Sequence, residues 1–265
     1  MDRDFLFHSP IFIGFAPTLS KRLNNFNYLC YVSRPDKIVV AIDGFSSCGK
    51  STLARELAKQ LHYVFIDSGA MYRGITLYAL RNNCIHGSEL DRGKLIQQLN
   101  NIQLSFRLNP ETQKPELYLN GENVEKEIRT PLVANHVSQV ATIKEVRTKL
   151  VDQQREMGKN GGVVMDGRDI GSVVFPNAEL KLFITAEIET RVQRRYQELK
   201  EKGLYTHKDE VRANLLERDR IDSTRKESPL TQTKDAVVID NTNMTRPEQL
   251  ELALELVEKK IVTLA

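Results

Sequence analysis

The sequence KIVVAIDGFSSCGKST at residues 37–52 decides the fold. Its first part, residues 38–42, is a continuous apolar run, which is typical of a strand buried on both faces of a parallel sheet. Residues 44–51 match the pattern G-x-x-x-x-G-K-[ST] in full, and leucines at positions 53, 57 and 61 then predict an amphipathic helix. Strand, loop and helix in this order predict a phosphate-binding loop; the alternative is a Gly/Ser-rich turn that fits by chance.

The residue types of this loop suit phosphate groups for physical reasons. Glycines let successive backbone N–H groups point inward, and the N-terminus of the following helix adds about half a positive charge. Lys50 would reach the β- and γ-phosphates of a nucleotide, and the Ser51 hydroxyl would bind Mg²⁺. The residues predicted to hold the phosphates are Gly44, Phe45, Ser46, Ser47, Cys48, Gly49, Lys50, Ser51 and Thr52.

Beyond this loop the chain alternates between strands and helices. Residues 64–66 are a second expected strand, Asp67 or Ser68 can cap the next helix, and residues 70–81 continue that helix. Buried strands are also expected at residues 163–165, 180–185 and 236–239, with a final helix at residues 247–261. This order predicts an α/β fold with a parallel sheet.

The middle of the chain does not continue this alternation of strands and helices. Residues 102–108 alternate between apolar and polar side chains, and Asn120-Gly121, which follows residues 117–119, favours a tight hairpin turn. We therefore expect an antiparallel insert. Thr130 and Pro131 then suit the cap and first position of one long helix that runs toward Met157.

Composition excludes several classes of protein. The 265 residues are 40% hydrophobic and 28% charged with a net charge of +3, which describes a globular protein rather than a nucleic-acid binder. The apolar run at residues 11–16 falls far short of a membrane span. Three cysteines, Cys30, Cys48 and Cys84, suit a reducing compartment, so we expect a cytoplasmic protein.

Residues 1–36 differ from the rest because they carry no periodic pattern. Asp2, Arg3 and Asp4 sum to a negative charge, whereas a secretory signal begins with positive charge. We expect a loosely ordered extension or a mis-assigned start at residues 1–36, followed by one catalytic domain at residues 37–265.

A phosphate-binding loop alone does not name a reaction. The motifs Asp-x-x-Gly and Asn-Lys-x-Asp, which a GTPase should carry, are absent from the sequence. Asp166 and Asp240 each follow an apolar strand, so each is either a magnesium-associated carboxylate or an ordinary residue at the end of a core strand.

Three further segments together resemble the bacterial-type cytidylate kinases: DSGAMYR at residues 67–73, DGRDIGSVVFP at residues 166–176 and RDRIDSTR at residues 218–225. The resemblance extends from Lys37 to about the C-terminus. It implies a three-layer P-loop kinase fold with a parallel sheet, a small antiparallel nucleotide-binding insert at about residues 100–135 and a helical lid at about residues 190–226. It also implies a monomer that transfers the γ-phosphoryl group of ATP to CMP or dCMP with Mg²⁺.

The resemblance assigns the acceptor site as well. Asp169 and Arg147, assisted by Ser138, are similar to the family's base-reading residues, and cytosine suits a carboxylate beside a guanidinium because it presents an amino donor next to two acceptors. By position alone, Ser138 and Arg147 are equally well explained as solvent-facing helix residues. Arg73, Arg168 and Arg225 resemble phosphate clamps, and Arg218 with Asp222 would hold the sugar, although these two also suit an intrahelical Arg/Asp ladder. Ser68 and Asp166 complete the expected substrate-binding set.

Arg191, Arg194 and Arg195 resemble the lid arginines of nucleoside monophosphate kinases, which bring positive charge to the transferring phosphoryl group together with the catalytic Lys50. Solvated surface arginines are the alternative, because the segment from Arg191 to Lys226 is rich in charges of both signs. Many relatives have glycine after the loop lysine, whereas this chain has Ser51, which restores the general consensus for magnesium binding.

Two other functions stay open at this point. One is a kinase for a different small acceptor, such as UMP, another nucleoside monophosphate or a shikimate-like alcohol. The other is a regulatory module that binds a nucleotide and signals through its lid. Asp169 paired with Arg147 argues for a pyrimidine, and the full set of acceptor arginines argues for an enzyme. The expected partners are therefore small molecules, with neither nucleic acid nor a membrane.

Overall fold

A five-stranded parallel sheet is the centre of the fold. The structure is a computed structural model that describes residues 37–264. The sheet has the order β10-β9-β1-β8-β2, with β1 at Val39–Gly44, β2 at Val64–Asp67, β8 at Val163–Gly167, β9 at Leu180–Thr185 and β10 at Val237–Asp240. All five residues of β8 are buried, and successive side chains of a strand point to opposite faces, so both faces of the sheet are covered. The predicted α/β fold is confirmed.

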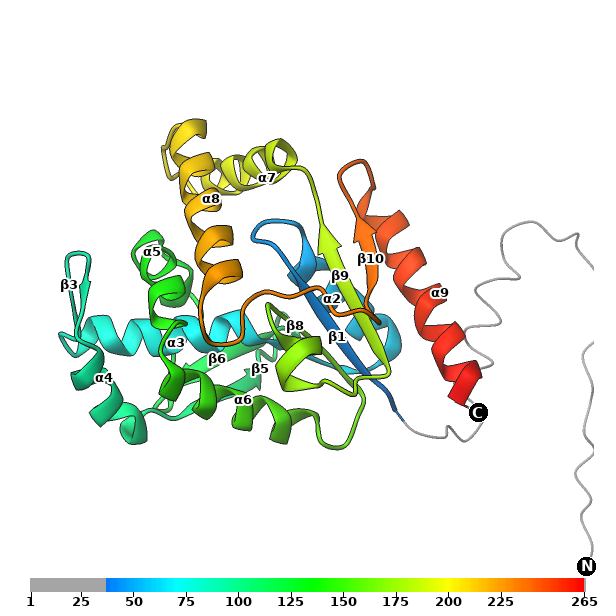
Figure 1. Ribbon diagram of the computed structural model, residues 1–265, viewed down its shortest axis with the longest axis horizontal. Coiled ribbons are helices and arrows are strands. Elements are labelled where there is room, and N and C mark those ends of the chain that lie inside the picture. The colour runs from blue at the N-terminus through cyan, green and yellow to red at the C-terminus, as the bar shows by residue number, and fades with distance from the viewer. Residues whose placement is uncertain (1–36, 265) are drawn as a thin grey trace, which may run out of the picture. The chain divides into compact units, whose positions relative to one another are not determined.

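Helices and two small sheets surround this centre (Figure 1). The helices are α2 Lys50–Leu61, α3 Ser68–Arg81, α4 Arg92–Gln98, α5 Pro131–Val140, α6 Lys144–Gly158, α7 Ile188–Glu201, α8 Lys208–Thr224 and α9 Arg246–Leu264, with short turns η1 Leu99–Asn101, η2 Glu127–Arg129 and η3 Ile170–Val174. Strands β3 Ile85–His86 and β4 Glu89–Leu90 form a hairpin, and β5 Leu104–Leu108, β6 Pro115–Leu119 and β7 Glu122–Asn123 form an antiparallel sheet. Helices α7 and α8 lie side by side beyond the carboxyl end of β9 (Figure 1). No helix in this part of the chain is long and apolar enough to cross a bilayer.

Most of the expected elements are present where the local patterns placed them. Asp67 caps α3 by accepting a hydrogen bond from the Ala70 N–H at 2.8 Å. Asn120 and Gly121 both have positive φ and form the expected turn. The antiparallel insert is confirmed as the sheet β5-β6-β7. The hairpin β3-β4 and α4 were not predicted, because elements this short carry too few residues to show a period.

The single long helix expected from Pro131 to Met157 is wrong. The first helix, α5, ends at Val140, and a second helix, α6, begins at Lys144. Thr142 turns its hydroxyl back to the Gln139 carbonyl at 2.7 Å, and Ile143 has an extended backbone with φ of −78° and ψ of 120° before α6 begins. A β-branched side chain that satisfies a nearby carbonyl in this way competes with helix continuation. The consequence for the site is described below.

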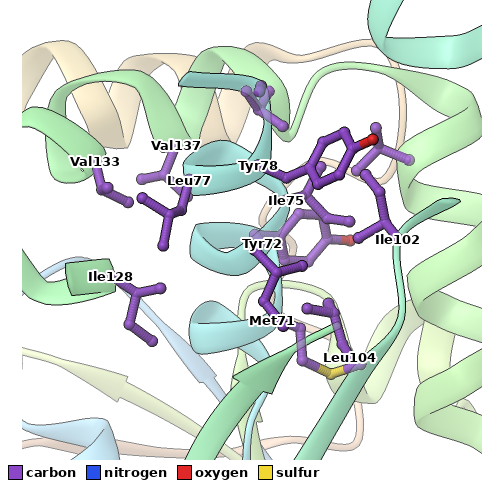
Figure 2. Close-up of a cluster of buried hydrophobic side chains, with 14 of the residues drawn as sticks. Met71, Tyr72, Ile75, Leu77, Tyr78, Ile102, Leu104, Ile128, Val133 and Val137 are labelled. Carbon is purple, nitrogen blue, oxygen red and sulfur yellow. The ribbon is translucent and has the colours of Figure 1, made fainter. Parts of the chain in front are cut away.

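A large buried cluster joins α3 to the antiparallel sheet and to α5 (Figure 2). Met71 and Ile75 of α3 are fully buried there, together with Ile128 of η2. Gly74 lets the sheet approach α3 closely, since a Cβ at this position would lie 2.8 Å from Leu117 Cδ2 and 2.9 Å from Leu104 Cδ2. This cluster therefore fixes the position of α3, which carries residues of the site.

We expect Gly74→Val to destabilise the protein by about 1–3 kcal/mol, because the added side chain overpacks the contact between α3 and the β5-β6 strands. Urea unfolding followed by circular dichroism measures this. Gly93→Val is the matched control, since Gly93 is an exposed helical residue whose Cβ would meet only Asp91 Oδ1 at 3.6 Å. Equal losses for both variants would contradict the packing argument.

Candidate active site

A cleft with a volume of about 860 Å³ contains most of the predicted site residues. It is lined by the loop after β1, the start of α3, facing parts of α5 and α6, the turn after β8, the helices α7 and α8, and the turn before α9. This is the crevice at the carboxyl ends of parallel strands where open α/β sheets bind their ligands. Within the expected insert at about residues 100–135, all of which the structure describes, Arg129 of η2 is the one lining residue, and none comes from β5-β6-β7; the lining residues of α5, Val137 and Ser138, follow the insert.

The loop after β1 has the curled backbone that its glycines predict. Gly44 has a φ of 144°, and a Cβ there would lie 2.0 Å from the Ile184 carbonyl oxygen, so only glycine fits between β1 and β9. The predicted loop residues that line the cleft are Ser46, Ser47, Gly49, Lys50, Ser51 and Thr52. The other three predicted loop residues, Gly44, Phe45 and Cys48, lie behind these and do not line the cleft. The Phe45 ring packs edge-on against Phe183 with 5.9 Å between centroids.

Lys50 is a buried cation directed into the loop itself. Its Nζ donates to the Phe45 carbonyl at 2.5 Å, and its side chain is 5% exposed. Burial lowers the pKa of Lys50, and the neighbouring Arg168 lowers it further. A phosphate group beside the ammonium would raise the pKa of Lys50 again, because an adjacent anion favours the charged form.

Asp166, at the end of β8, has the surroundings expected of a magnesium-associated carboxylate. Its Oδ2 accepts a hydrogen bond from the Ser51 hydroxyl at 2.6 Å, while its buried Oδ1 has no hydrogen-bond partner among residues 37–264. Burial raises the pKa of Asp166 to about 6, and the nearby Asp67 carboxylate contributes. The Ser68 hydroxyl donates to the Asp166 carbonyl at 2.7 Å and so joins α3 to this strand end. Asp240, the alternative position, is exposed and accepts only from its own turn through Thr242.

The expected base-reading residues meet at one end of the cleft. Arg147 and Asp169 form a buried ion pair, with 3% and 4% exposure, and Ser138 beside them is 6% exposed. The solvent-facing alternative for Ser138 and Arg147 is therefore wrong. Nine residues span two and a half turns of a helix with 3.6 residues per turn, so a continuous helix would put these two residues on opposite sides. The break between α5 and α6 brings both into the cleft, and Arg147 then donates to the Ala141 carbonyl of that break at 3.1 Å.

The expected phosphate and sugar residues gather between the loop and the base end. Asp222 accepts from Arg168 Nε at 2.9 Å and from Arg225 Nη1 at 3.3 Å, so its carboxylate holds both guanidinium groups in place. Arg73 and Arg218 also line the cleft, and neither forms an ion pair with any residue that the structure describes. Burial and the charge of Arg218 lower the pKa of Arg73 to about 9; burial and the charge of Arg168 lower the pKa of Arg218 to about 10. The positive charge of Arg73 and Arg218 therefore exceeds the negative charge of the groups around them.

The comparisons with known proteins agree with this geometry. Residues 40–259 match the family described as Cytidylate kinase. The chain is 57% identical to a cytidylate kinase of Flavobacterium psychrophilum, over 83% of this chain and 98% of that protein. It is 55% identical to one of Parabacteroides distasonis and 52% identical to one of Bacteroides fragilis, in both cases over 85% of this chain and 98% of the relative. The chain belongs to the cytidylate kinase family.

The three arginines expected to serve as lid residues in this cytidylate kinase occupy different environments. Arg194 and Arg195 line the cleft; Arg194 donates to both the side-chain and backbone oxygens of Asn241 at 2.9 Å, and Arg195 pairs with Glu198 at 2.7 Å. Arg191 is not among the lining residues. It lies behind the phosphate-binding loop, where it pairs with Asp219 at 2.5 Å and its guanidinium covers the Phe45 ring at 5.2 Å.

Sequence reasoning missed several residues of the kinase cleft. Tyr72 has a buried hydroxyl without a hydrogen-bond partner among the described residues, and its ring lies 5.3 Å from the Arg147 guanidinium. Asn241 donates to the Cys48 carbonyl at 2.6 Å, and Arg129 pairs with Asp67 at 2.8 Å. Tyr72 stands beside Arg73 in the quoted DSGAMYR segment and could have been found there. Asn241 and Arg129 belong to no motif, so no local signal pointed to them.

Arg129 controls the charge of Asp67. Burial raises the pKa of the Asp67 carboxyl, but the charge and hydrogen bond of Arg129, together with the Ala70 N–H and the charge of Arg73, outweigh burial and hold that pKa below its ordinary value. A carboxyl with a lowered pKa in the folded state stabilises the fold above its unfolded pKa, and this stabilisation is lost as the pH falls through the folded pKa.

We expect Arg129→Gln to lower the free energy of unfolding by about 1–3 kcal/mol at neutral pH, because it leaves a buried carboxylate without its cation. Burial, opposed then only by the Ala70 N–H and the charge of Arg73, raises the pKa of Asp67 in the variant, so the loss should shrink as the pH falls from about 7 to about 4. Urea unfolding across this range measures it. Arg212→Gln is the control, since its pair with Glu189 is exposed and should contribute less than about 0.5 kcal/mol at any pH. A loss for Arg129→Gln that grows toward acid pH would refute the assignment.

Proposed function

We propose that the enzyme transfers the γ-phosphoryl group of ATP to CMP or dCMP and releases ADP with CDP or dCDP. The observation that carries this proposal is the buried pair of Arg147 and Asp169 at one end of a cleft whose other end is a phosphate-binding loop. Family membership supports the same reaction.

The pair suits cytosine better than uracil. Asp169 can accept from the exocyclic amino group, while the Arg147 guanidinium and the Ser138 hydroxyl can donate to the ring nitrogen and carbonyl. Arg147 Nε is buried without a hydrogen-bond partner in the described part of the chain, so a donor is available. Uracil places an acceptor opposite Asp169, a mismatch that costs about 1–3 kcal/mol, or roughly 5- to 150-fold in discrimination.

Arginines would hold the phosphate of the acceptor nucleotide. Arg73, Arg168 and Arg225 are the clamps, because guanidinium groups bind pairs of phosphate oxygens and stay charged at neutral pH. Arg225 Nη2 and Arg218 Nε are buried without hydrogen-bond partners among residues 37–264. Asp222 and Arg218, at the shared face of α8, would hold the sugar between phosphate and base.

The donor site suits ATP with Mg²⁺. Inward backbone N–H groups of the loop and Lys50 would bind the phosphates of ATP. The Ser51 hydroxyl and the Asp166 carboxylate fit Mg²⁺, because Oδ1 of Asp166 is buried and unpartnered within the described residues and because Mg²⁺ is usually held by one or two protein oxygens plus phosphates. The ion, when bound, neutralises charge that develops on the phosphate oxygens.

The lid would complete the site when both nucleotides are bound. Arg194 and Arg195 already line the cleft, so they are placed to surround the transferring group with positive charge. Arg191 would act from behind the loop by holding Asp219 and the Ser46 backbone. A closed lid also excludes water, which would otherwise accept the phosphoryl group.

We also propose that residues 37–265 form the catalytic domain, with the insert and lid at about residues 100–135 and 190–226, and that the protein works as a cytoplasmic monomer on small molecules. The modest net charge of +3 and the cysteine usage support this. Cys48 and Cys84 are buried free thiols, and Cys30 lies outside the described residues, as does the expected extension at residues 1–36.

A coupled assay of ADP release with CMP, dCMP, UMP, AMP and GMP tests the function. We expect the cytosine nucleotides to give the highest kcat/KM, with UMP roughly 5- to 150-fold lower because of the mismatch at Asp169. Equal rates across the panel would favour a less selective kinase. ADP release without any acceptor would favour the nucleotide-binding module.

Lys50→Ala should lower kcat by several orders of magnitude, because it removes the cation closest to the transferring phosphates, while the Tm stays nearly unchanged. Turnover with CMP and differential scanning calorimetry measure the two effects. Lys59→Ala is the control, since Lys59 is an exposed residue of the same helix and should affect neither quantity. A collapse of the Tm in Lys50→Ala would assign Lys50 to the fold instead.

A further inference from the structure

Asp169 occupies a position in which a carboxylate ordinarily has a different task. It is the residue immediately before η3, and its carbonyl accepts from the Val173 N–H at 2.9 Å. An aspartate at the start of a helical turn usually accepts from the free N–H groups of that turn. The side chain of Asp169 caps nothing, because it pairs with Arg147.

Asp43 supplies the missing cap from a different strand. It lies near the carboxyl end of β1, directly before Gly44 of the phosphate-binding loop, and is 5% exposed. Its Oδ1 accepts from the Ile170 N–H at 2.8 Å and its Oδ2 accepts from the Gly171 N–H at 2.7 Å. Both oxygens of one carboxylate are therefore used to satisfy the first two N–H groups after Asp169.

Without Asp43 these two N–H groups would be buried and unsatisfied. Ile170 is fully buried and Gly171 is also buried, so water cannot replace the lost acceptor easily. The acceptor that is next along the chain is the carboxylate of Asp169, which sits at the capping position. Asp169 could satisfy its own turn only by leaving Arg147, because one carboxylate cannot point in both directions.

We propose that Asp43 is a positioning residue for base recognition: it caps η3 so that the Asp169 carboxylate stays on Arg147 and faces the base of the acceptor nucleotide. The inference rests on the proposed function, since it gives the pair of Arg147 and Asp169 the task of reading cytosine. This role also explains why the carboxylate of Asp43 lies beside the phosphate-binding loop although it does not line the cleft.

Asp43→Asn tests the proposal, because the side chain keeps its shape and one acceptor oxygen, but its amide NH₂ cannot accept a hydrogen bond, so one of the two N–H groups loses its acceptor. We expect the ratio of kcat/KM for CMP to that for UMP to fall by at least about fivefold, toward the ratio of Asp169→Asn. The KM for CMP should rise while the KM for ATP changes little. A change in kcat that is common to CMP and UMP, for example through the nearby Lys50, cancels in this ratio.

Two further variants separate positioning from general damage to the fold. Asp91→Asn is the matched control, since Asp91 caps α4 outside the cleft by accepting from the Lys94 N–H at 2.9 Å; its ratio should stay that of the natural chain. Asp43→Asn combined with Asp169→Asn should lower the ratio no further than Asp169→Asn alone, because both act through one carboxylate.

The outcomes distinguish a failure of the proposed function from a failure of the positioning role of Asp43. If the natural chain shows no preference for CMP over UMP, the proposed function fails, and the inference fails with it. If the natural chain prefers CMP and Asp43→Asn keeps that preference, the inference is overturned while the function stands. Asp43→Ser, whose single acceptor oxygen stands on a shorter side chain, is measured beside it and should also lower the ratio. Failure of both variants to fold would assign Asp43 to the fold and overturn the positioning role.

Discussion

The buried Lys50 and the half-buried Arg73 and Arg218 lie at the carboxyl end of the sheet without an ion-pair partner among residues 37–264, and this imbalance of charge governs the site. Burial lowers the pKa of Lys50, Arg73 and Arg218, and neighbouring arginines lower all three further. Such an arrangement costs free energy in the protein alone, because burying a charge is unfavourable unless it is paired. A phosphate group removes that cost. The cleft is therefore organised for anions at two places, the loop after β1 and the arginines between α3 and α8.

The parts of the fold that local patterns encode were predictable. A continuous apolar run marks β1, four-residue spacing of leucines marks α2, and the pattern at residues 44–51 marks the loop between them. These features depend only on residues within one turn or one strand, so the sequence displays them directly. The break between α5 and α6 was missed, because Thr142 and Ile143 are acceptable in a helix. The bond from the Thr142 hydroxyl to Gln139 and the packing of Ile143 in the buried cluster leave no periodic signal in the sequence.

The candidate site was predictable as a set of residues but not as a geometry. Motif resemblance named Ser138, Arg147 and Asp169, yet spacing alone put Ser138 and Arg147 on opposite sides of one helix. Their convergence depends on the break at residues 141–143. No local signal marks Asp43, since the two N–H groups that donate to it lie more than a hundred residues further along the chain. Contacts over such separations leave no period or spacing in a single sequence.

Ser46 shows why donor loop, acceptor clamp and lid have to be considered together. Its hydroxyl accepts from Arg168 at 2.8 Å, its carbonyl accepts from Arg191 at 3.4 Å, and its N–H donates to Asp219 at 3.4 Å. Arg168 is in turn bound to Asp222 of α8. A phosphate group that drew Arg168 away from the Ser46 hydroxyl would release one of the three bonds that join this loop residue to its surroundings. Because the other two bonds lead to Arg191 of α7 and Asp219 of α8, a change at Ser46 would also reach the contacts between the loop and these two helices.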